Sequence, residues 1–254
     1  MIDRIFQILI TDGAVDQSRF SSDLKRNIES LQAVYPDATY EMFDHDMIAD
    51  FLQHHFPRDV LDTFHALTPY AFKADLARYC LLHKFGGLYS DLSYLHLRAI
   101  TAENGTNMVV FRDIPGHPSW ATSNAIIYAK PQAAALERAI DMIVAHHKAG
   151  YYGQHPLDPT GPYLFGRALA AADDWTTTVF GDSQLVSVEK SGRANILKVG
   201  PAGEVIAIRN KVNNCSIDEL IAGHSNSYSD LWAAKRIWGE TGLMHSIKTK
   251  LGRS

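Results

Sequence analysis

The start of the chain alternates segments of strand and helix character, and this order predicts an α/β protein with a mostly parallel sheet. The apolar run 5–10 has the character of a buried strand, and residues 20–35 place apolar side chains at helical spacing. Residues 39–43 alternate as a strand does, and residues 46–56 can form a short helix that ends at Pro57. Strand, helix, strand and helix in succession are typical of βαβ units.

The rest of the chain continues without an internal repeat, a low-complexity tract or a clear linker, so one continuous domain is expected. The pair Gly86-Gly87 ends a helix over residues 70–84, because glycine readily adopts the left-handed conformation that closes helices. Further strands are expected at 88–92, 107–112, 125–128 and within 184–212, further helices at 132–147, at 165–172 and from 233 onward, and a long loop at 150–162.

Composition excludes several classes of protein. The 254 residues are 46% apolar and 20% charged, as in soluble globular proteins. The net charge of −4 argues against a general nucleic-acid binder, whose surface would be basic. No apolar run reaches the ~18 residues of a membrane-spanning helix, and the N-terminus lacks the features of a secretory signal. Cys80 and Cys215 lack metal-binding spacing, so reduced thiols in a cytoplasmic protein are expected.

The stretch from residue 70 to residue 95 holds the candidate site. Asp75 and Arg78 lie three positions apart on the predicted helix and therefore share one face. Asp91 follows the next apolar strand as an isolated carboxylate, and the carboxyl ends of strands in α/β sheets are where nucleotides bind. The stretch thus supplies a hydrogen-bond acceptor, a cation for phosphate and a carboxylate suited to a metal ion.

The same stretch resembles the DXD-type glycosyltransferases of the sugar-binding-region family. That family's pattern is a helix with Asp and Arg three apart, then Gly-Gly, an apolar residue, Tyr, one residue and Asp-x-Asp; Tyr89 and Asp91 continue the match here. The family includes capsular-polysaccharide transferases, initiating mannosyltransferases of the yeast type and, more distantly, the clostridial glucosylating toxins. Weaker similarities within residues 1–235 include Ser123-Asn124-Ala125, Thr160-Gly161-Pro162 and the segment from Asn226 to Trp232.

The resemblance implies a GT-A fold, a Rossmann-like nucleotide-sugar-binding domain, over residues 1–235, with a basic amphipathic segment at 236–254 as a helical elaboration of the same domain. It implies a retaining hexosyltransferase that moves a sugar from a UDP- or GDP-linked donor to a glycan or glycolipid, in surface polysaccharide synthesis and with Mn²⁺ or Mg²⁺. The implied catalytic residues are Asp91, Arg78 and Asn124, the donor-binding residues Asp75, Arg78, Tyr89, Asp91, Ser93, Thr160, Gly161 and Trp232, and the metal ligands Asp91, Asn226 and His224.

The sequence departs from the family pattern at Ser93, which stands where the second aspartate of the motif is expected. A hydroxyl is a much poorer ligand for a hard cation than a carboxylate. Three alternatives therefore stay open. Asp91 holds the metal together with the diphosphate, water and Asn226 or His224; cations such as Arg78 replace the metal; or the chain is an inactive homologue. The sequence contains no convincing nucleophilic carboxylate, so attack by the acceptor on the face that the diphosphate leaves is the preferred mechanism.

Two other functions compete with sugar transfer. Ser93 favours a nucleotide-sugar- or glycan-binding homologue without activity. An effector that glycosylates proteins ranks third, because neither extra domains nor a translocation segment is evident. The basic tail at 235–254 also carries an apolar stripe, which favours either peripheral contact with the anionic inner face of a membrane or packing of the tail on the domain.

Overall fold

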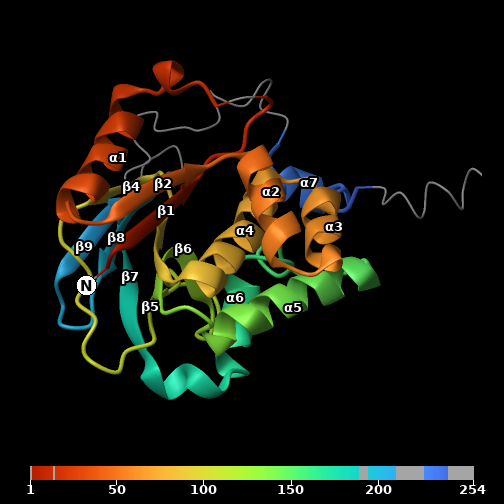
Figure 1. Cartoon of the computed structure of the whole chain (residues 1–254). Coiled ribbons are helices and arrows are strands. Elements are labelled where there is room, and N and C mark those ends of the chain that lie inside the picture. The colour runs from red at the N-terminus through yellow and green to blue at the C-terminus, as the bar shows by residue number, and fades with distance from the viewer. Residues whose placement is uncertain (1, 14, 189–193, 210–225, 240–254) are drawn as a thin grey trace, which may run out of the picture.

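One nine-stranded sheet runs through the computed structural model, which describes residues 2–13, 15–188, 194–209 and 226–239 (Figure 1). The strands lie in the order β2-β1-β3-β6-β5-β7-β8-β9-β4. They are β1 (Arg4–Ile8), β2 (Thr39–Phe43), β3 (Gly87–Ser90), β4 (Tyr94–His96), β5 (Met108–Arg112), β6 (Thr122–Ala129), β7 (Thr178–Val188), β8 (Ala194–Val199) and β9 (Val205–Arg209).

Seven α-helices accompany the sheet within the described ranges, and Figure 1 shows α1 on one side of the sheet and α2 to α6 on the other. The predicted α/β class is confirmed by this arrangement. The helices are α1 (Ser22–Val34), α2 (His45–His55), α3 (Arg58–Ala66), α4 (Tyr70–Phe85), α5 (Ala134–Ala149), α6 (Pro162–Ala170) and α7 (Tyr228–Ala233).

The central strands are buried on both faces. On β1, Phe6 enters the larger hydrophobic core, which α2 to α6 close. Its neighbour Ile5 enters a second core on the opposite face, where it packs with Leu31 of α1. Successive side chains of a strand point to opposite faces, so a strand covered on both sides appears in the sequence as a run that is apolar except for Gln7, whose buried amide donates to the Ser90 carbonyl at 3.2 Å.

The expectation of a mostly parallel sheet is wrong. Three of the eight strand pairings are parallel, namely β1 with β2, β1 with β3, and β5 with β7. The other five are antiparallel. Residues 184–212 were expected to be rich in strand, and β7 to β9 are there, but they extend the sheet as an antiparallel meander. Antiparallel neighbours need only short connections, so this part of the sheet required no further helices.

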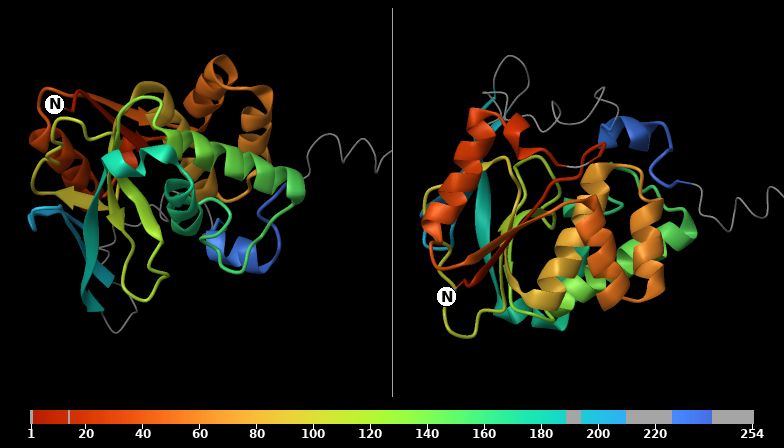
Figure 2. Two further views of the ribbon diagram at one scale, coloured as in Figure 1. Left: turned by 90° about the horizontal axis from the view of Figure 1, so that it is seen from below. Right: turned by 45° about the horizontal axis from the view of Figure 1, so that its top comes forward.

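The sheet curls back toward β3. Tyr94 begins β4 only three positions after Asp91, and its amide N–H donates to the Asp91 carbonyl oxygen at 3.3 Å. Nevertheless β4 pairs with β9, at the opposite end of the strand order from β1 and β2. In Figure 2 the light-blue β9 lies beside the yellow β4. The inner faces of β8 and β9 are thereby brought close to the carboxyl end of β3.

Two helix predictions need correction. Helix α3 was not predicted, because Pro57 was interpreted as a stop; Pro57 instead directly precedes the first helical residue, where proline loses no hydrogen bond. The helix expected from Ala233 onward is wrong over 234–239. Helix α7 ends there because Lys235 has a φ of 56°, after which Ile237 is fully buried. Residues 240–254 lie outside the described residues.

Candidate functional site

A cavity of about 340 Å³ lies between α4, the turn after β3 and the inner face of β4, β9 and β8. It sits at the carboxyl end of β3, as the sequence predicted for the position of Asp91. The start of β6 and the loop before α6 complete its wall. The predicted site residues that line it are Asp75, Arg78, Asp91, Asn124 and Gly161.

Two glycines set the path of the chain from α4 into the site. Gly86 ends α4 with a φ of 67°, and Gly87 follows with a φ of 103°. A Cβ atom on Gly87 would lie 2.6 Å from the carbonyl oxygen of Arg4 in β1. The absence of a side chain therefore lets β3 pair closely with β1, and this pairing directs Asp91 into the cavity.

Asp75 is the centre of a buried hydrogen-bond network. Its Oδ1 accepts from the Nδ2 of Asn124 at 2.8 Å, and its Oδ2 accepts from the Thr160 hydroxyl at 2.7 Å. Asn124 Nδ2 also donates to the Tyr79 hydroxyl at 2.8 Å, which in turn donates to the Thr160 carbonyl at 3.1 Å. The network joins α4, β6 and the loop before α6, three segments that lie far apart in the sequence.

Arg78 connects this network to Asp91. Its Nη2 lies 3.2 Å from Asp75 Oδ1, and its Nη1 lies 3.1 Å from Asp91 Oδ1. Nη1 also donates to the Asn124 carbonyl at 2.7 Å, and the guanidinium lies over the Tyr89 ring, 4.4 Å from its centroid. The Tyr89 hydroxyl donates to Asp91 Oδ1 at 2.7 Å. The Asp91 side chain is nevertheless 34% exposed and lines the cavity.

Burial sets the protonation of the network. It raises the pKa of the Asp75 carboxyl, and Arg78 and the Thr160 hydroxyl offset this rise only in part. Burial acts to lower the pKa of Arg78, but the surrounding Tyr89, Asp91 and Asp75 raise it overall, so the guanidinium stays charged. Burial also holds the pKa of the Tyr89 hydroxyl well above its usual value, which keeps that hydroxyl a donor.

The sequence analysis missed two cations in the cavity wall. Lys198 on β8 is 1% exposed and donates to the hydroxyls of Ser123 and Ser183, both at 2.6 Å. Arg209 on β9 lines the same cavity. Lys198 between the apolar Leu197 and Val199 was a usable signal, because lysine is rarely fully buried unless a partner offsets its charge.

Other predicted site residues lie outside the cavity wall. Ser93 is half-buried on the turn between β3 and β4. Trp232 on α7 donates its indole N–H to the Tyr152 carbonyl at 2.6 Å and packs beside the larger core. Thr160 and Tyr89 act through the network and do not line the cavity. Their roles toward a donor stay predictions.

The described residues do not by themselves fit a divalent metal ion. Across the described ranges, no three His, Cys, Asp or Glu side chains are grouped to hold one. Oδ1 of Asp91 is already engaged by Arg78 and Tyr89. The amide of Asn226 accepts from the Tyr70 N–H at 2.6 Å and donates to the Thr68 carbonyl, which fixes it at the start of α4. His224 lies outside the described residues, so the set predicted for the metal stays a prediction.

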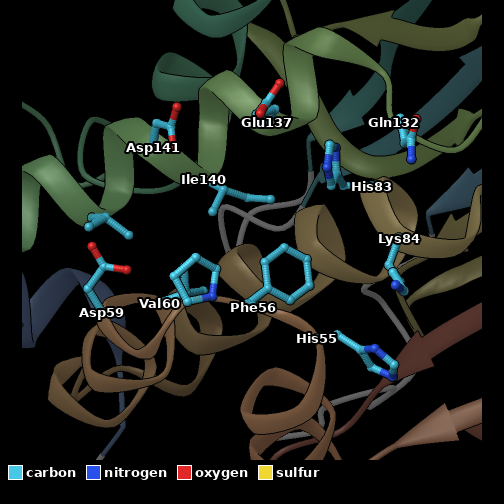
Figure 3. A pocket seen from close by; sticks show the side chains of 12 residues that line it. His55, Phe56, Asp59, Val60, His83, Lys84, Gln132, Glu137, Ile140 and Asp141 are labelled. Carbon is cyan, nitrogen blue, oxygen red and sulfur yellow. The ribbon is translucent and has the colours of Figure 1, made fainter.

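A second cavity, of about 480 Å³, opens between α5 and the ends of α2, α3 and α4 (Figure 3). In Figure 3, Glu137, Ile140 and Asp141 of α5 line one side, and His83 and Phe56 line the other. This cavity shares no residue with the first. Its residues are therefore suitable for control variants that leave the first cavity unchanged.

Fold and site together define an α/β protein with a polar cavity at the carboxyl end of a central strand. Residues 21–111 match the family model described as glycosyltransferase sugar-binding region containing DXD motif. The matched segment runs from the start of α1 to β5 and includes Asp75, Arg78 and Asp91. The predicted resemblance to DXD-type glycosyltransferases is confirmed over this segment.

Individual proteins are similar to this chain in part of their sequence or in their structure. An uncharacterized glycosyltransferase of Acanthamoeba polyphaga mimivirus is 34% identical over 71 residues, which span 28% of this chain and 28% of that protein. The solved structure of PaToxG glycosyltransferase superposes with a TM-score of 0.48 at 17% identity, over 66% of this chain and 69% of that one. A solved transferase superposes with a TM-score of 0.37 at 10% identity, over 65% of this chain and 82% of that one.

Proposed function

We propose that this chain is a glycosyltransferase that uses a nucleotide-sugar donor. The observation that carries the proposal is the placement of Asp91. It lies at the carboxyl end of β3, lines a cavity of about 340 Å³ with its side chain partly exposed, and is held there by Arg78 and Tyr89. A carboxylate so placed can accept a ribose hydroxyl of a nucleotide bound at the edge of the sheet.

The neighbouring residues have distinct proposed roles. Arg78 orients Asp91, the Asn124 carbonyl in turn holds Arg78, and both residues line the proposed path of the sugar. Asp75 is a positioning residue, because both of its oxygens are engaged by Asn124, Arg78 and Thr160. Gly161 lines the cavity beside Asp75, and a Cβ there would meet Asp75 Oδ2 at an ordinary 3.6 Å.

Transfer with retention of the anomeric configuration is the mechanism that we propose. The other two carboxylates of the cavity are poor nucleophiles: Asp75 is bound within the network, and Asp113 accepts from the Ile114 N–H and pairs with His117 at 2.8 Å. The acceptor hydroxyl would attack on the face that the diphosphate leaves and would pass its proton to the departing phosphate oxygen. Trapping of a covalent glycosyl-enzyme would contradict this route.

Donor and acceptor are tested together. Wild-type protein is offered a panel of UDP- and GDP-sugars, and release of UDP or GDP is measured with and without Mn²⁺ and with glycan or glycolipid acceptors. We expect turnover of at least one donor, in line with a role in surface polysaccharide synthesis. Full activity in Asp91→Ala would overturn the assignment of the site.

Ser93 supports a second candidate, a homologue that binds nucleotide sugars or glycans without turnover. Calorimetry with UDP and GDP separates the two functions: binding with no turnover on any donor and acceptor favours the second. An effector that glycosylates proteins is the third candidate, and transfer of label to protein acceptors in place of glycans would favour it.

Membrane contact through residues 235–254 is also a proposal. No helix in the described ranges is long and apolar enough to cross a membrane. Ile237 is fully buried, and Trp238 donates its indole N–H to the Tyr151 carbonyl at 3.0 Å. A truncation that tests the tail should therefore keep residues up to Gly239. Flotation with anionic liposomes that is equal for the full chain and for this truncation would remove the membrane proposal.

A further inference from the structure

Two cations face the cavity from strands outside the matched residues 21–111. Arg209 on β9 stands opposite Tyr94 of β4 on one side and opposite Ile196 of β8 on the other. Lys198 follows Ile196 by two positions on β8. Residues paired directly across strands, and residues two apart along a strand, point to the same face of a sheet. All four side chains accordingly line the same cavity.

Lys198 retains capacity for a ligand. Its ammonium group has three N–H donors, and two of them reach the hydroxyls of Ser123 and Ser183. Ser183 Oγ in turn donates to the Arg112 carbonyl, which orients that hydroxyl as an acceptor for Lys198. Both partners are neutral, so the charge of Lys198 is solvated by dipoles and is not cancelled.

Arg209 also has a hydrogen-bond donor that no described residue uses. Its Nε is buried and has no hydrogen-bond partner among the residues that the structure describes. Its guanidinium lies beside the Tyr94 hydroxyl, which is neutral because burial raises the pKa of that hydroxyl far above neutrality. Because Arg209 lines the cavity, an anion there can approach its guanidinium and balance its charge.

The carboxylates of the cavity are already balanced by other cations. Asp75 and Asp91 share Arg78, and Asp113 pairs with His117. Within the described part of the chain, Lys198 and Arg209 form no ion pair with any of them. A diphosphate entering beside Asp91 would be repelled by that carboxylate, so its binding needs an unpaired positive charge on the other wall.

We propose that Lys198 and Arg209 bind the diphosphate of the nucleotide donor and stabilise the negative charge that develops when the sugar leaves. This inference rests on the proposed transferase function. The bond between the anomeric carbon and the diphosphate oxygen breaks, and its electron pair stays on that oxygen. The acceptor oxygen forms the new bond to the anomeric carbon, and its proton passes to the released diphosphate. The two cations perform the electrostatic task that a metal ion has where the motif carries two aspartates.

Lys198 must carry its proton to bind the diphosphate, so its pKa bears on the proposed role. Burial lowers its pKa to about 7, the charge of Arg209 lowers it as well, and Asp113 and Asp91 oppose this. The other groups against the amine are the hydroxyls of Ser123 and Ser183 and the rings of Tyr94 and Phe111, none of which carries charge near neutrality. A bound diphosphate raises the pKa, so donor binding above neutral pH should take up a proton.

The test is calorimetry with UDP and GDP in EDTA, on wild-type protein, Lys198→Met and Arg209→Gln. Lys73→Met is the matched control: Lys73 is also buried, its pKa is also lowered by burial, to about 8, and it donates to the Phe64 carbonyl away from the cavity. We expect each cavity variant to lose roughly 10- to 100-fold in affinity for the nucleoside diphosphate and little for uridine or guanosine, which lack phosphate. Lys73→Met should bind as the wild type does.

Proton uptake gives an independent readout that a purely structural lysine would not move. Titrations in buffers of different ionisation enthalpy should show uptake for the wild type and none for Lys198→Met. Should Lys198→Met fail to fold, Arg209→Gln provides the test, because Arg209 is only half-buried. Its affinity for the nucleoside diphosphate is then compared with its affinity for the nucleoside. Wild-type affinity in both cavity variants, or wild-type binding that requires Mn²⁺, overturns the inference while leaving the transferase standing. Absence of any nucleotide binding by the wild type contradicts the proposed function itself.

Discussion

Replacing Thr160 by valine measures how much the buried network contributes to stability. The Thr160 hydroxyl is inaccessible to solvent and donates to Asp75 Oδ2 at 2.7 Å. Hydrogen bonds to charged groups contribute about 1.5–3 kcal/mol. Valine has nearly the same shape, so the change removes the bond without opening a cavity and leaves Asp75 Oδ2 without its donor. We expect a loss of about 1.5–3 kcal/mol in the free energy of unfolding.

The matched control is Thr63→Val. Thr63 is equally inaccessible, and its hydroxyl contacts two groups without a carboxylate among them: it donates to the Asp59 backbone carbonyl at 2.7 Å and lies 2.9 Å from His147 Nδ1. Each neutral hydrogen bond contributes about 0.5–1.5 kcal/mol. Both variants are unfolded in urea and followed by circular dichroism. For a chain of this size, each kcal/mol corresponds to about 2–4 °C in Tm, so thermal unfolding provides a second measurement.

Two outcomes would refute the reasoning. The first is a loss in Thr160→Val below about 1.5 kcal/mol, the most that a single neutral hydrogen bond contributes, which would mean that the Asp75 carboxylate adds nothing to the bond. The second concerns pH. Because burial raises the pKa of Asp75, acidification protonates this carboxyl sooner than an exposed one and makes the hydrogen bond neutral. The difference between the two variants should narrow as pH falls, and a difference that widens would contradict the charge-assisted bond.

Three further predictions follow from single positions. The pKa of Lys198 is about 7 in the folded protein and 10.5 for an ordinary lysine, so between these pH values the unfolded chain binds one more proton than the folded chain. The free energy of unfolding therefore rises with pH over this range, by at most about 1.4 kcal/mol per pH unit. Lys198→Met should flatten this slope when unfolding in urea is measured at several pH values. Gly87→Ala should lower the free energy of unfolding by about 2–5 kcal/mol, because the φ of Gly87 is 103° and a Cβ there would collide with β1. The control Gly150→Ala, where a Cβ would meet open space, should lower it by about 1 kcal/mol. Asp91→Asn should lower sugar transfer by about 100-fold or more with little change in Tm, whereas Asp141→Asn in the second cavity should not change activity.

Local signals explain the parts of the fold that the sequence predicted. The run 5–10 is apolar except for Gln7 because both faces of the first strand are covered, and Gly86 and Gly87 mark the end of α4 because only glycine tolerates their backbone angles. The spacing of Asp75 and Arg78 on one helix likewise placed both at the cavity. Each of these inferences needed information from a few neighbouring residues alone.

The missed parts depend on long-range pairing. The position of β4 beside β9 follows from register between residues more than a hundred positions apart, and no local pattern specifies it. Lys198 could not be assigned to the site without that curl. Trp232 was predicted to bind the donor because its segment resembles a motif of the family. In the structure its indole N–H donates to the Tyr152 carbonyl, a contact that depends on how α7 packs and that the sequence does not show.

Ser93, which replaces a carboxylate of the motif, and Lys198, which adds a positive charge to the cavity, both disfavour a divalent ion beside Asp91. A divalent ion beside Asp91 would share its cavity with the positive charges of Arg78 and Lys198, and the repulsion between these like charges would cost binding free energy. One carboxylate that already pairs with Arg78 offsets little of this cost. Metal binding would be favoured when Lys198 loses its proton, which happens as pH rises above about 7, whereas binding of a diphosphate by Lys198 requires the proton. Donor affinity that strengthens with rising pH therefore indicates metal, and affinity that weakens indicates the lysine.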